Sequence, residues 1–256
     1  MNRILFIIIV AQFSCTSVWF AGNAVTSEMA LDKGFAPDFW VLLTSAVQFG
    51  FIAGTLLFAL LALADKFSPS IVFSCSALMA SLFNGLVTLD WMGANQVFIA
   101  RFFTGFFLAG IYPVGMKIAA DYFEKGLGKS LGFLVGALVL GTAFPHLIKF
   151  FSFDYSWKYI FYGTSLLSVF GGLLLVGLVK DGPYRKQLGQ VNIHVLKEVI
   201  RLPLLRKAAF GYFGHMWELY AFWTFVPMML ALKLKGVNFN TALLSFLIIA
   251  VGSLAC

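Results

Sequence analysis

Long apolar runs with short connections between them constrain this chain more than any other feature. A membrane-spanning helix needs about 20 mostly apolar residues. The runs that meet this need cover roughly Ile4–Thr26, Phe39–Leu63, Ser70–Leu89, Gln96–Ala119, Leu131–Phe151, Trp157–Val179, Ala208–Leu232 and Thr241–Cys256. The chain is therefore predicted to be an all-α, multi-pass membrane protein.

Composition excludes several other classes. Of the 256 residues, 61% are hydrophobic and 11% are charged, whereas a soluble domain carries about 25% charged residues. Cys15, Cys75 and Cys256 lie in apolar runs and form no CxxC pair, so neither a zinc site nor a disulfide framework is expected. The net charge of +7 comes from basic residues in the connections, which argues against nucleic-acid binding. No metal or cofactor is expected.

The placement of Lys and Arg predicts the orientation in the membrane. With the N-terminus in the cytoplasm, twelve basic residues fall on the inner side and five on the outer side. The inner set is Arg3, Lys66, Lys117, Lys125, Lys129, Lys180, Arg185, Lys186, Lys197, Arg201, Arg206 and Lys207; the outer set is Lys33, Lys149, Lys158, Lys233 and Lys235. We expect a bacterial cytoplasmic (inner) membrane protein with a cytoplasmic N-terminus.

One long connection suggests how the chain is divided. Residues 1–180 form a predicted six-span bundle, residues 181–207 a basic cytoplasmic linker, and residues 208–256 the start of a second bundle with two spans. Apolar residues at helical spacing predict a short interfacial helix in the linker; they are Val191, Val195, Leu196, Val199 and Ile200. No polar tail follows the last apolar run, so we expect a sequence truncated after the eighth span, lacking the rest of the C-terminal half.

The connection between spans two and three resembles a motif of the major facilitator superfamily. Ala64–Phe67 is similar to the core of the family's Gly-x-Leu-Ala-Asp-Arg-x-Gly-Arg-Arg loop, with Asp65 and Lys66 at the acid and the first base. The motif's two glycines and its arginine pair are absent here. The resemblance implies that Asp65 and Lys66 latch one conformation; an incidental Asp–Lys pair in a solvated loop is the alternative.

The fourth span carries the family's Arg-x-x-x-Gly pattern as Arg101 and Gly105, followed by Tyr112. A centrally placed Arg costs about 2.5–3.5 kcal/mol on membrane-insertion scales, so it normally faces the protein interior or a wet cavity. Arg101 is expected to hold an anionic substrate or to influence a proton-carrying acid. The alternative is that it extends to the outer interface.

Other candidates follow from the helices that face the transport cavity in this family, which are spans one, two, four and seven. They are the cavity-lining groups Gln12, Gln48, Tyr112 and Tyr212. Each alone also fits an interhelical hydrogen bond. The fifth span resembles the Gly- and Pro-rich fifth helix of some members, and Pro145 followed by His146 marks a bend near its outer end.

The seventh span contains His215 and Glu218, three residues apart on one helical face. Because His titrates near neutral pH and an intramembrane Glu needs a partner or a proton, the pair is predicted to couple transport to protons. A structural His–Glu hydrogen bond and a metal site are the alternatives, although no second motif completes a metal site.

The resemblance implies a secondary active transporter of a small solute, an anion or organic acid, that works by alternating access and is coupled to protons. Its overall pattern is closest to nitrate/nitrite- and cyanate-type bacterial carriers. The expected partners are the solute, protons and the lipid bilayer. An inactive truncated remnant or a non-transporting sensor is the alternative. An enzyme is not expected, because no nucleophile–base pair or repeated acidic cluster occurs.

Overall fold

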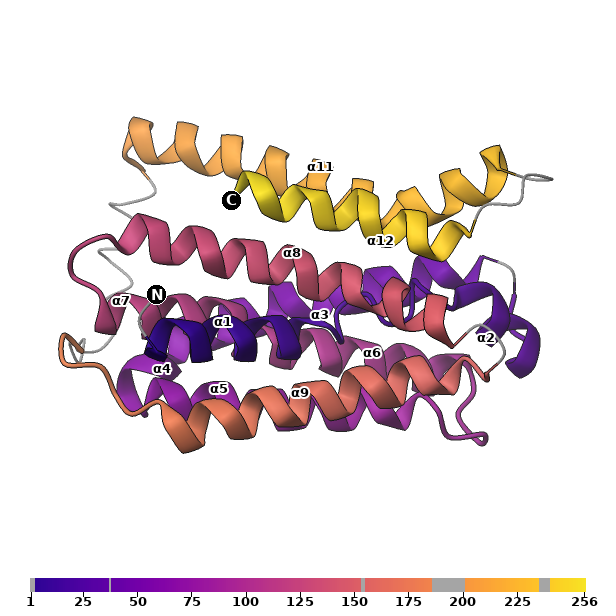
Figure 1. The fold of residues 1–256 in the computed structure, drawn as a ribbon, viewed down its shortest axis with the longest axis horizontal. Helices are drawn as coiled ribbons and strands as arrows, with labels where there is room; N and C mark the ends of the chain where they lie inside the picture. Colours follow the sequence, from indigo (N-terminus) through magenta and orange to yellow (C-terminus); the bar gives the residue numbers. More distant parts are fainter. Residues whose placement is uncertain (1–2, 37, 153–154, 186–200, 235–239) are drawn as a thin grey trace.

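The computed structural model describes residues 3–36, 38–152, 155–185, 201–234 and 240–256, and the regular elements within these ranges are all helices (Figure 1). They are α1 (Arg3–Thr16), α2 (Thr26–Lys33), α3 (Phe39–Leu61), α4 (Leu63–Lys66), α5 (Pro69–Leu86), α6 (Ala94–Leu108), α7 (Tyr112–Tyr122), α8 (Leu127–Phe151), α9 (Lys158–Leu178), α11 (Pro203–Lys233), α12 (Thr241–Val251) and the 3-10 helix η1 (Gly252–Ala255). The all-α prediction is confirmed.

Among the described residues, five helical segments are long and apolar enough to cross a membrane. They are Phe39–Leu61, Pro69–Leu86, Ala94–Tyr122, Leu127–Phe151 and Lys158–Leu178, and they match the predicted second to sixth spans. The seventh and eighth predicted spans correspond to α11 and to α12 with η1. The interfacial helix predicted around Val191–Ile200 lies outside the described residues.

Two predicted spans differ from the expected continuous helix. The first was expected over Ile4–Thr26, but α1 ends at Thr16 and irregular turns continue to the short helix α2. The fourth is divided into α6 and α7 by a turn over Ala109–Ile111. Hydropathy did not reveal either interruption, because both turns contain enough apolar residues to continue the apolar run.

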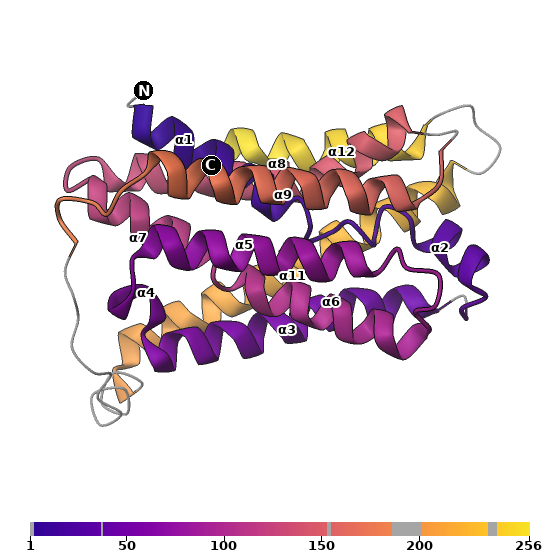
Figure 2. The same ribbon diagram turned by 90° about the horizontal axis from the view of Figure 1, so that it is seen from below.

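The helices run side by side along the long axis of the molecule (Figures 1 and 2). Helix α3 packs on α6, α5 on α9 and α6, and α1 on α8 and α9. Helices α11 and α12 cover one face, with α12 against α8 (Figure 1). The boundary between this layer and the other helices is the region where a solute cavity is expected in a two-bundle transporter.

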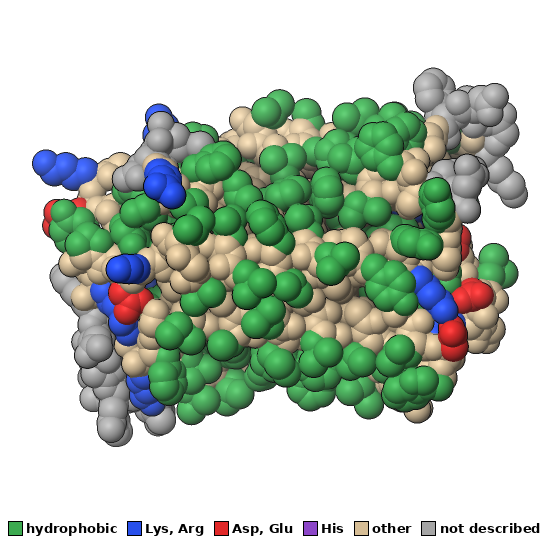
Figure 3. Space-filling view, turned by 60° about the horizontal axis from the view of Figure 1, so that its bottom comes forward, with side chains coloured by type: hydrophobic (Ala, Val, Ile, Leu, Met, Phe, Trp, Pro, Cys, Tyr) green, Lys and Arg blue, Asp and Glu red, His purple; other side chains and the backbone are tan. Residues whose placement is uncertain are grey.

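The surface has the pattern of a protein in a bilayer. In Figure 3, hydrophobic side chains cover the middle of the visible face, and charged side chains gather at its two ends. Exposed large apolar residues on the long helices include Phe49, Ile52, Leu56, Leu166 and Leu173. In water these residues would form a large apolar patch, whereas lipid chains solvate them.

Glycine allows α3 and α6 to approach each other closely. A Cβ atom at Gly105 of α6 would lie 2.0 Å from the carbonyl oxygen of Val47, and one at Gly50 of α3 would lie 1.9 Å from the carbonyl oxygen of Phe102. In both cases the obstacle is backbone, which cannot rotate away. Small residues permit such backbone contact between membrane helices.

We therefore expect Gly105→Ala to destabilise the folded protein by about 1–3 kcal/mol, the usual effect of overpacking. Gly177→Ala is the matched control, because a Cβ atom there meets nothing within 4 Å. Thermal unfolding of the purified protein in one detergent compares the two variants. Equal melting temperatures would contradict the proposed close contact.

Candidate functional site

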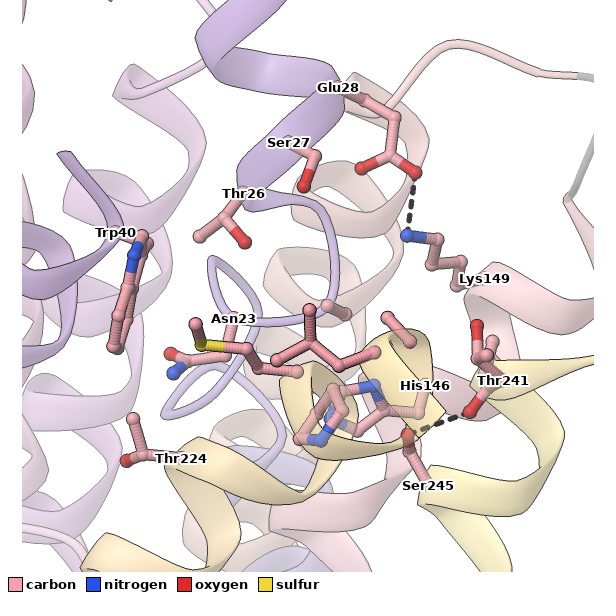
Figure 4. Close-up of a pocket in the computed structure, with 16 residues that line it drawn as sticks. Asn23, Thr26, Ser27, Glu28, Trp40, His146, Lys149, Thr224, Thr241 and Ser245 are labelled. Carbon is pink, nitrogen blue, oxygen red and sulfur yellow. Dashed lines mark hydrogen bonds and ion pairs between the residues drawn. The ribbon is translucent and has the colours of Figure 1, made fainter. Parts of the chain in front are cut away.

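A polar cavity of about 340 Å³ lies between the α1–α2 connection, α3 and α8 on one side and α11 and α12 on the other. Its polar lining residues are Asn23, Thr26, Ser27, Glu28, His146, Lys149, Thr224, Thr241 and Ser245. In Figure 4, Trp40, Asn23 and Thr224 lie along one side, and Lys149, His146, Thr241 and Ser245 lie along the other. The cavity is at the end of the bundle that is predicted to face outward.

Helix α8 supplies the two nitrogen bases of the cavity. It runs through Pro145 as one helix, and His146 and Lys149 are three residues apart on it, so they share a face. The His146 side chain is 1% exposed, and its Nε2 has no hydrogen-bond partner among the described residues. Lys149 Nζ forms an ion pair with Glu28 Oε1 of α2 at 2.6 Å.

A charged cluster next to the cavity fixes the position of α2. Lys33 Nζ donates to two backbone carbonyls of the α5–α6 connection at 2.8 and 3.2 Å, and Trp157 Nε1 donates to Asp32 Oδ2 at 2.9 Å. Lys158 pairs with Asp90. The hydrogen bond from Lys158 lowers the pKa of Asp90, while partial burial lowers the pKa of Lys33. The cluster ties α2 to its neighbours and so places Glu28 at the cavity.

The interrupted part of the first span forms another wall of the cavity. After Thr16 the backbone continues in three-residue turns, with hydrogen bonds from Trp19 N to Thr16 O, Asn23 N to Phe20 O and Val25 N to Gly22 O, each 3.1 Å. Such turns leave carbonyl groups without α-helical partners. Irregular backbone at membrane depth is tolerated only where protein or a wet cavity satisfies it.

Arg101 satisfies two of these carbonyl groups. Its Nη2 donates to Trp19 O at 2.6 Å, and its Nη1 donates to Val18 O at 3.1 Å and to Asn84 Oδ1 at 2.6 Å. The guanidinium also lies 5.8 Å from the centre of the Phe161 ring. With 1% exposure, Arg101 does not extend to the outer interface, so that interpretation is wrong. Its geometry supports a structural role; the predicted substrate contact stays a prediction.

Asn84 extends the Arg101 network to α9. Its amide nitrogen donates to Phe161 O, Thr164 Oγ1 and Ser165 Oγ at 3.2, 3.1 and 2.9 Å. Because a single amide links α5, α6 and α9, the position of the first span depends on three other spans.

The remaining cavity-lining candidates lie elsewhere in the molecule. Gln12 of α1 is fully buried beside Gly115, and neither polar atom of its amide has a partner among the described residues. Tyr112 is partly buried near the 53% exposed Tyr212, and their phenol groups interact electrostatically. Gln48 is partly exposed on α3. None of the four residues lines the cavity of Figure 4.

His215 and Glu218 lie on an exposed face of α11. The buried positions of this helix are Trp223 and Val226. Within the described part of the chain, neither His215 nor Glu218 forms a hydrogen bond or an ion pair, so the alternative of a His–Glu hydrogen bond is not realised. No group of three metal-ligating side chains occurs among the described residues.

A group of charged contacts surrounds Asp65 at the opposite end of the bundle. Asp65 Oδ1 forms an ion pair with Lys117 Nζ at 2.9 Å. The same Nζ lies 3.7 Å from Asp121 Oδ1. Arg185 Nη2 donates to the carbonyl oxygens of Asp65 and Phe67 at 3.2 and 2.8 Å. Lys66, by contrast, is exposed and has no partner among the described residues. The sequence pointed to Asp65, whereas Lys117 and Arg185, which contact its segment, lie far along the chain. A latching role for Asp65 and Lys66 stays a prediction.

Long apolar helices, an interrupted first span held by a buried Arg and a polar cavity between two helical layers define a multi-pass membrane transport protein. The family model described as Major Facilitator Superfamily matches residues 6–256, and the chain belongs to this family of secondary transporters, which work by alternating access.

The fold is also similar to a solved structure, the xylose transporter XylE from E. coli in a partially occluded inward-open conformation. The TM-score is 0.58 at 12% sequence identity, over 98% of this chain and 69% of that chain. At this identity the likeness concerns the fold and not the solute. No curated protein matched the chain in sequence.

We expect Arg101→Met to destabilise the protein by about 3–5 kcal/mol, because it leaves the carbonyls of Val18 and Trp19 and the Asn84 amide without their donor. Arg101→Lys should recover only part of this loss, since an ammonium group lacks the forked donors of a guanidinium. Thermal unfolding measures both effects. A stable Arg101→Met protein would show that the three acceptors find other partners.

At the latch, Lys117→Gln should weaken the attachment of the α4 segment, whereas Lys66→Gln should have no effect. Alkylation of a cysteine introduced at Phe67 reports this directly, because loosening raises the labelling rate. Comparable rates in the two variants would mean that the Lys117–Asp65 pair does not hold the segment.

Proposed function

We propose that this protein carries a small anion or organic acid across the bacterial inner membrane in a proton-coupled manner, with its N-terminus in the cytoplasm. The observation that carries the proposal is the cavity between the two helical layers, where Lys149 supplies a cation and His146 a titratable base. Solute sites in this class of transporter lie between two helical repeats.

The proposal divides the chain as the sequence suggests, into a bundle over residues 1–180, a linker over 181–207 and part of a second bundle over 208–256. Rocking of one bundle against the other would open the cavity alternately to the two sides. The Arg101 network supports this movement, because it makes the first bundle move as one unit. The Asp65–Lys117 pair would break and re-form at the inner end.

The anionic solute is favoured by Lys149 and not by Arg101. Nη1 and Nη2 of Arg101 already donate hydrogen bonds to oxygen atoms of the protein. Lys149, in contrast, lines the cavity and is partly exposed. The subgroup whose sequence pattern this chain resembles, the nitrate/nitrite- and cyanate-type carriers, transports small anions as well.

Proton coupling is assigned in this proposal to the predicted pair His215 and Glu218. Both are ionisable and stand on α11, the helix that also borders the cavity through Thr224 and Pro227.

Uptake into proteoliposomes under an imposed pH gradient tests the proposal. We expect uptake of a small organic anion to accelerate when the outside is acidic, and Glu218→Gln to abolish this acceleration while the protein remains folded. Lys66→Gln serves as a charge-removal control outside the pathway. Uptake by Glu218→Gln that is unimpaired and still responds to pH would make the coupling assignment wrong.

A further inference from the structure

Of the buried side chains that have a polar atom without a hydrogen-bond partner among the described residues, His146 is the one that lines the cavity. An imidazole nitrogen enclosed by protein and without a hydrogen-bond partner is rare in native proteins, because burial removes the water that would otherwise satisfy it. Nε2 of His146 is in this state, and the side chain lines the cavity. A hydrogen-bonding ligand in the cavity would supply the missing partner.

The neighbouring ion pair points to the kind of ligand. Lys149 faces the same cavity, and its ion-pair partner is the carboxylate of Glu28. The Glu28 side chain is 47% exposed while that of Lys149 is 27% exposed, so the acid lies closer to the opening. An exposed side chain releases an ion partner readily, because water solvates the freed carboxylate. Glu28 thus occupies the place that the carboxylate of a solute would take.

The charges of the residues that line the cavity around His146 are balanced. Helix α2 contributes the negative Glu28, and α8 contributes the positive Lys149. Among the cavity-lining residues, the α1–α2 connection, α3, α11 and α12 contribute uncharged ones, such as Asn23, Trp40 and Thr241. A monoanion entering this cavity adds one negative charge, which a proton on the buried imidazole would neutralise.

We propose that His146 and Lys149 form a binding site for a small monocarboxylate, that the solute displaces Glu28 from Lys149, and that His146 takes up one proton as the solute binds. This inference rests on the proposed transport function and names its solute class. In the binding step the Lys149–Glu28 ion pair breaks, a Lys149–carboxylate ion pair forms, and one proton passes from water to Nε2, which donates a hydrogen bond to the solute.

The size and lining of the cavity fit this class. A volume of about 340 Å³ accommodates a solute of a few carbon atoms. Trp40 and Met228 provide apolar surface for the remainder of the solute. A cation is disfavoured because it would meet Lys149 beside its binding position, and a dianion because one imidazole proton balances only one charge.

Isothermal titration of the purified full-length chain in nanodiscs tests the site. Formate, acetate, lactate and pyruvate are the probes, with lactamide as the uncharged counterpart of lactate. We expect at least one carboxylate to bind and lactamide to bind at least tenfold more weakly. His146→Gln should weaken carboxylate binding about 10- to 100-fold, the range for a hydrogen bond to a charged group.

Glu28→Gln should change the carboxylate affinity in the opposite direction to His146→Gln. Because it removes the intramolecular competitor, carboxylate affinity should rise by several-fold. Glu124→Gln, the same change at an exposed carboxylate in the α7–α8 connection at the other end of the bundle, is the matched control and should leave the affinity unchanged. Since Glu28 is partly exposed, this variant is expected to fold even if His146→Gln does not.

Titration in two buffers of different ionisation enthalpy measures the protons taken up. We expect about one proton per carboxylate bound in the unmodified protein and in His215→Gln, and none in His146→Gln. The affinity of the unmodified protein should fall as pH rises, while that of His146→Gln should not depend on pH. Proton uptake that survives in His146→Gln, or a Glu28→Gln protein that binds more weakly, would overturn the inference.

Binding and transport separate the two proposals. If all four carboxylates fail to bind while another solute is transported with protons, the inference is overturned and the proposed coupling remains. If a carboxylate binds as expected but no uptake responds to a pH gradient, the site stands and the proposed proton-coupled transport is wrong.

Discussion

The need to satisfy backbone polar groups inside a bilayer governs this structure. The first span stops being an α-helix at Thr16, and the carbonyls that follow require donors that lipid cannot provide. Arg101 supplies donors to two of them, and its charge is solvated by oxygen acceptors from two segments, the turns after α1 and α5. A charge that would be costly on an isolated helix thus becomes the link between a broken span and the rest of the first bundle.

The candidate site follows from that break. A continuous first span would carry the chain straight to the surface, whereas the turns after Thr16 bring Asn23 to the cavity wall and α2 across its opening. Glu28 then reaches Lys149 of α8. The same residues that interrupt the helix therefore create the polar space between the two layers. The hydrogen bonds of Asn84 hold α5 and α9 in position next to the interrupted span.

Prediction from sequence succeeded where the signal was local. Length and apolarity identified the spans that became α3, α5, α8 and α9, and the motif around Asp65 located an ion-paired acid. Prediction did not reveal distant partners: Lys117 and Arg185 contact the Asp65 segment from later parts of the chain. His146 was read only as part of a helix bend, since a single His between apolar residues has no distinguishing pattern.

By itself, the sequence determined the class of protein, because twenty-residue apolar runs and so few charges leave only a helical bundle in a membrane. It also determined the family, through short motifs at the ends of spans. The tertiary structure alone decided which polar groups are satisfied. Arg101 donates to backbone carbonyls of the first span, which its sequence context did not predict, and Nε2 of His146 has no partner among the described residues. Burial and pairing depend on neighbours brought together by packing, and no periodicity along the chain encodes them.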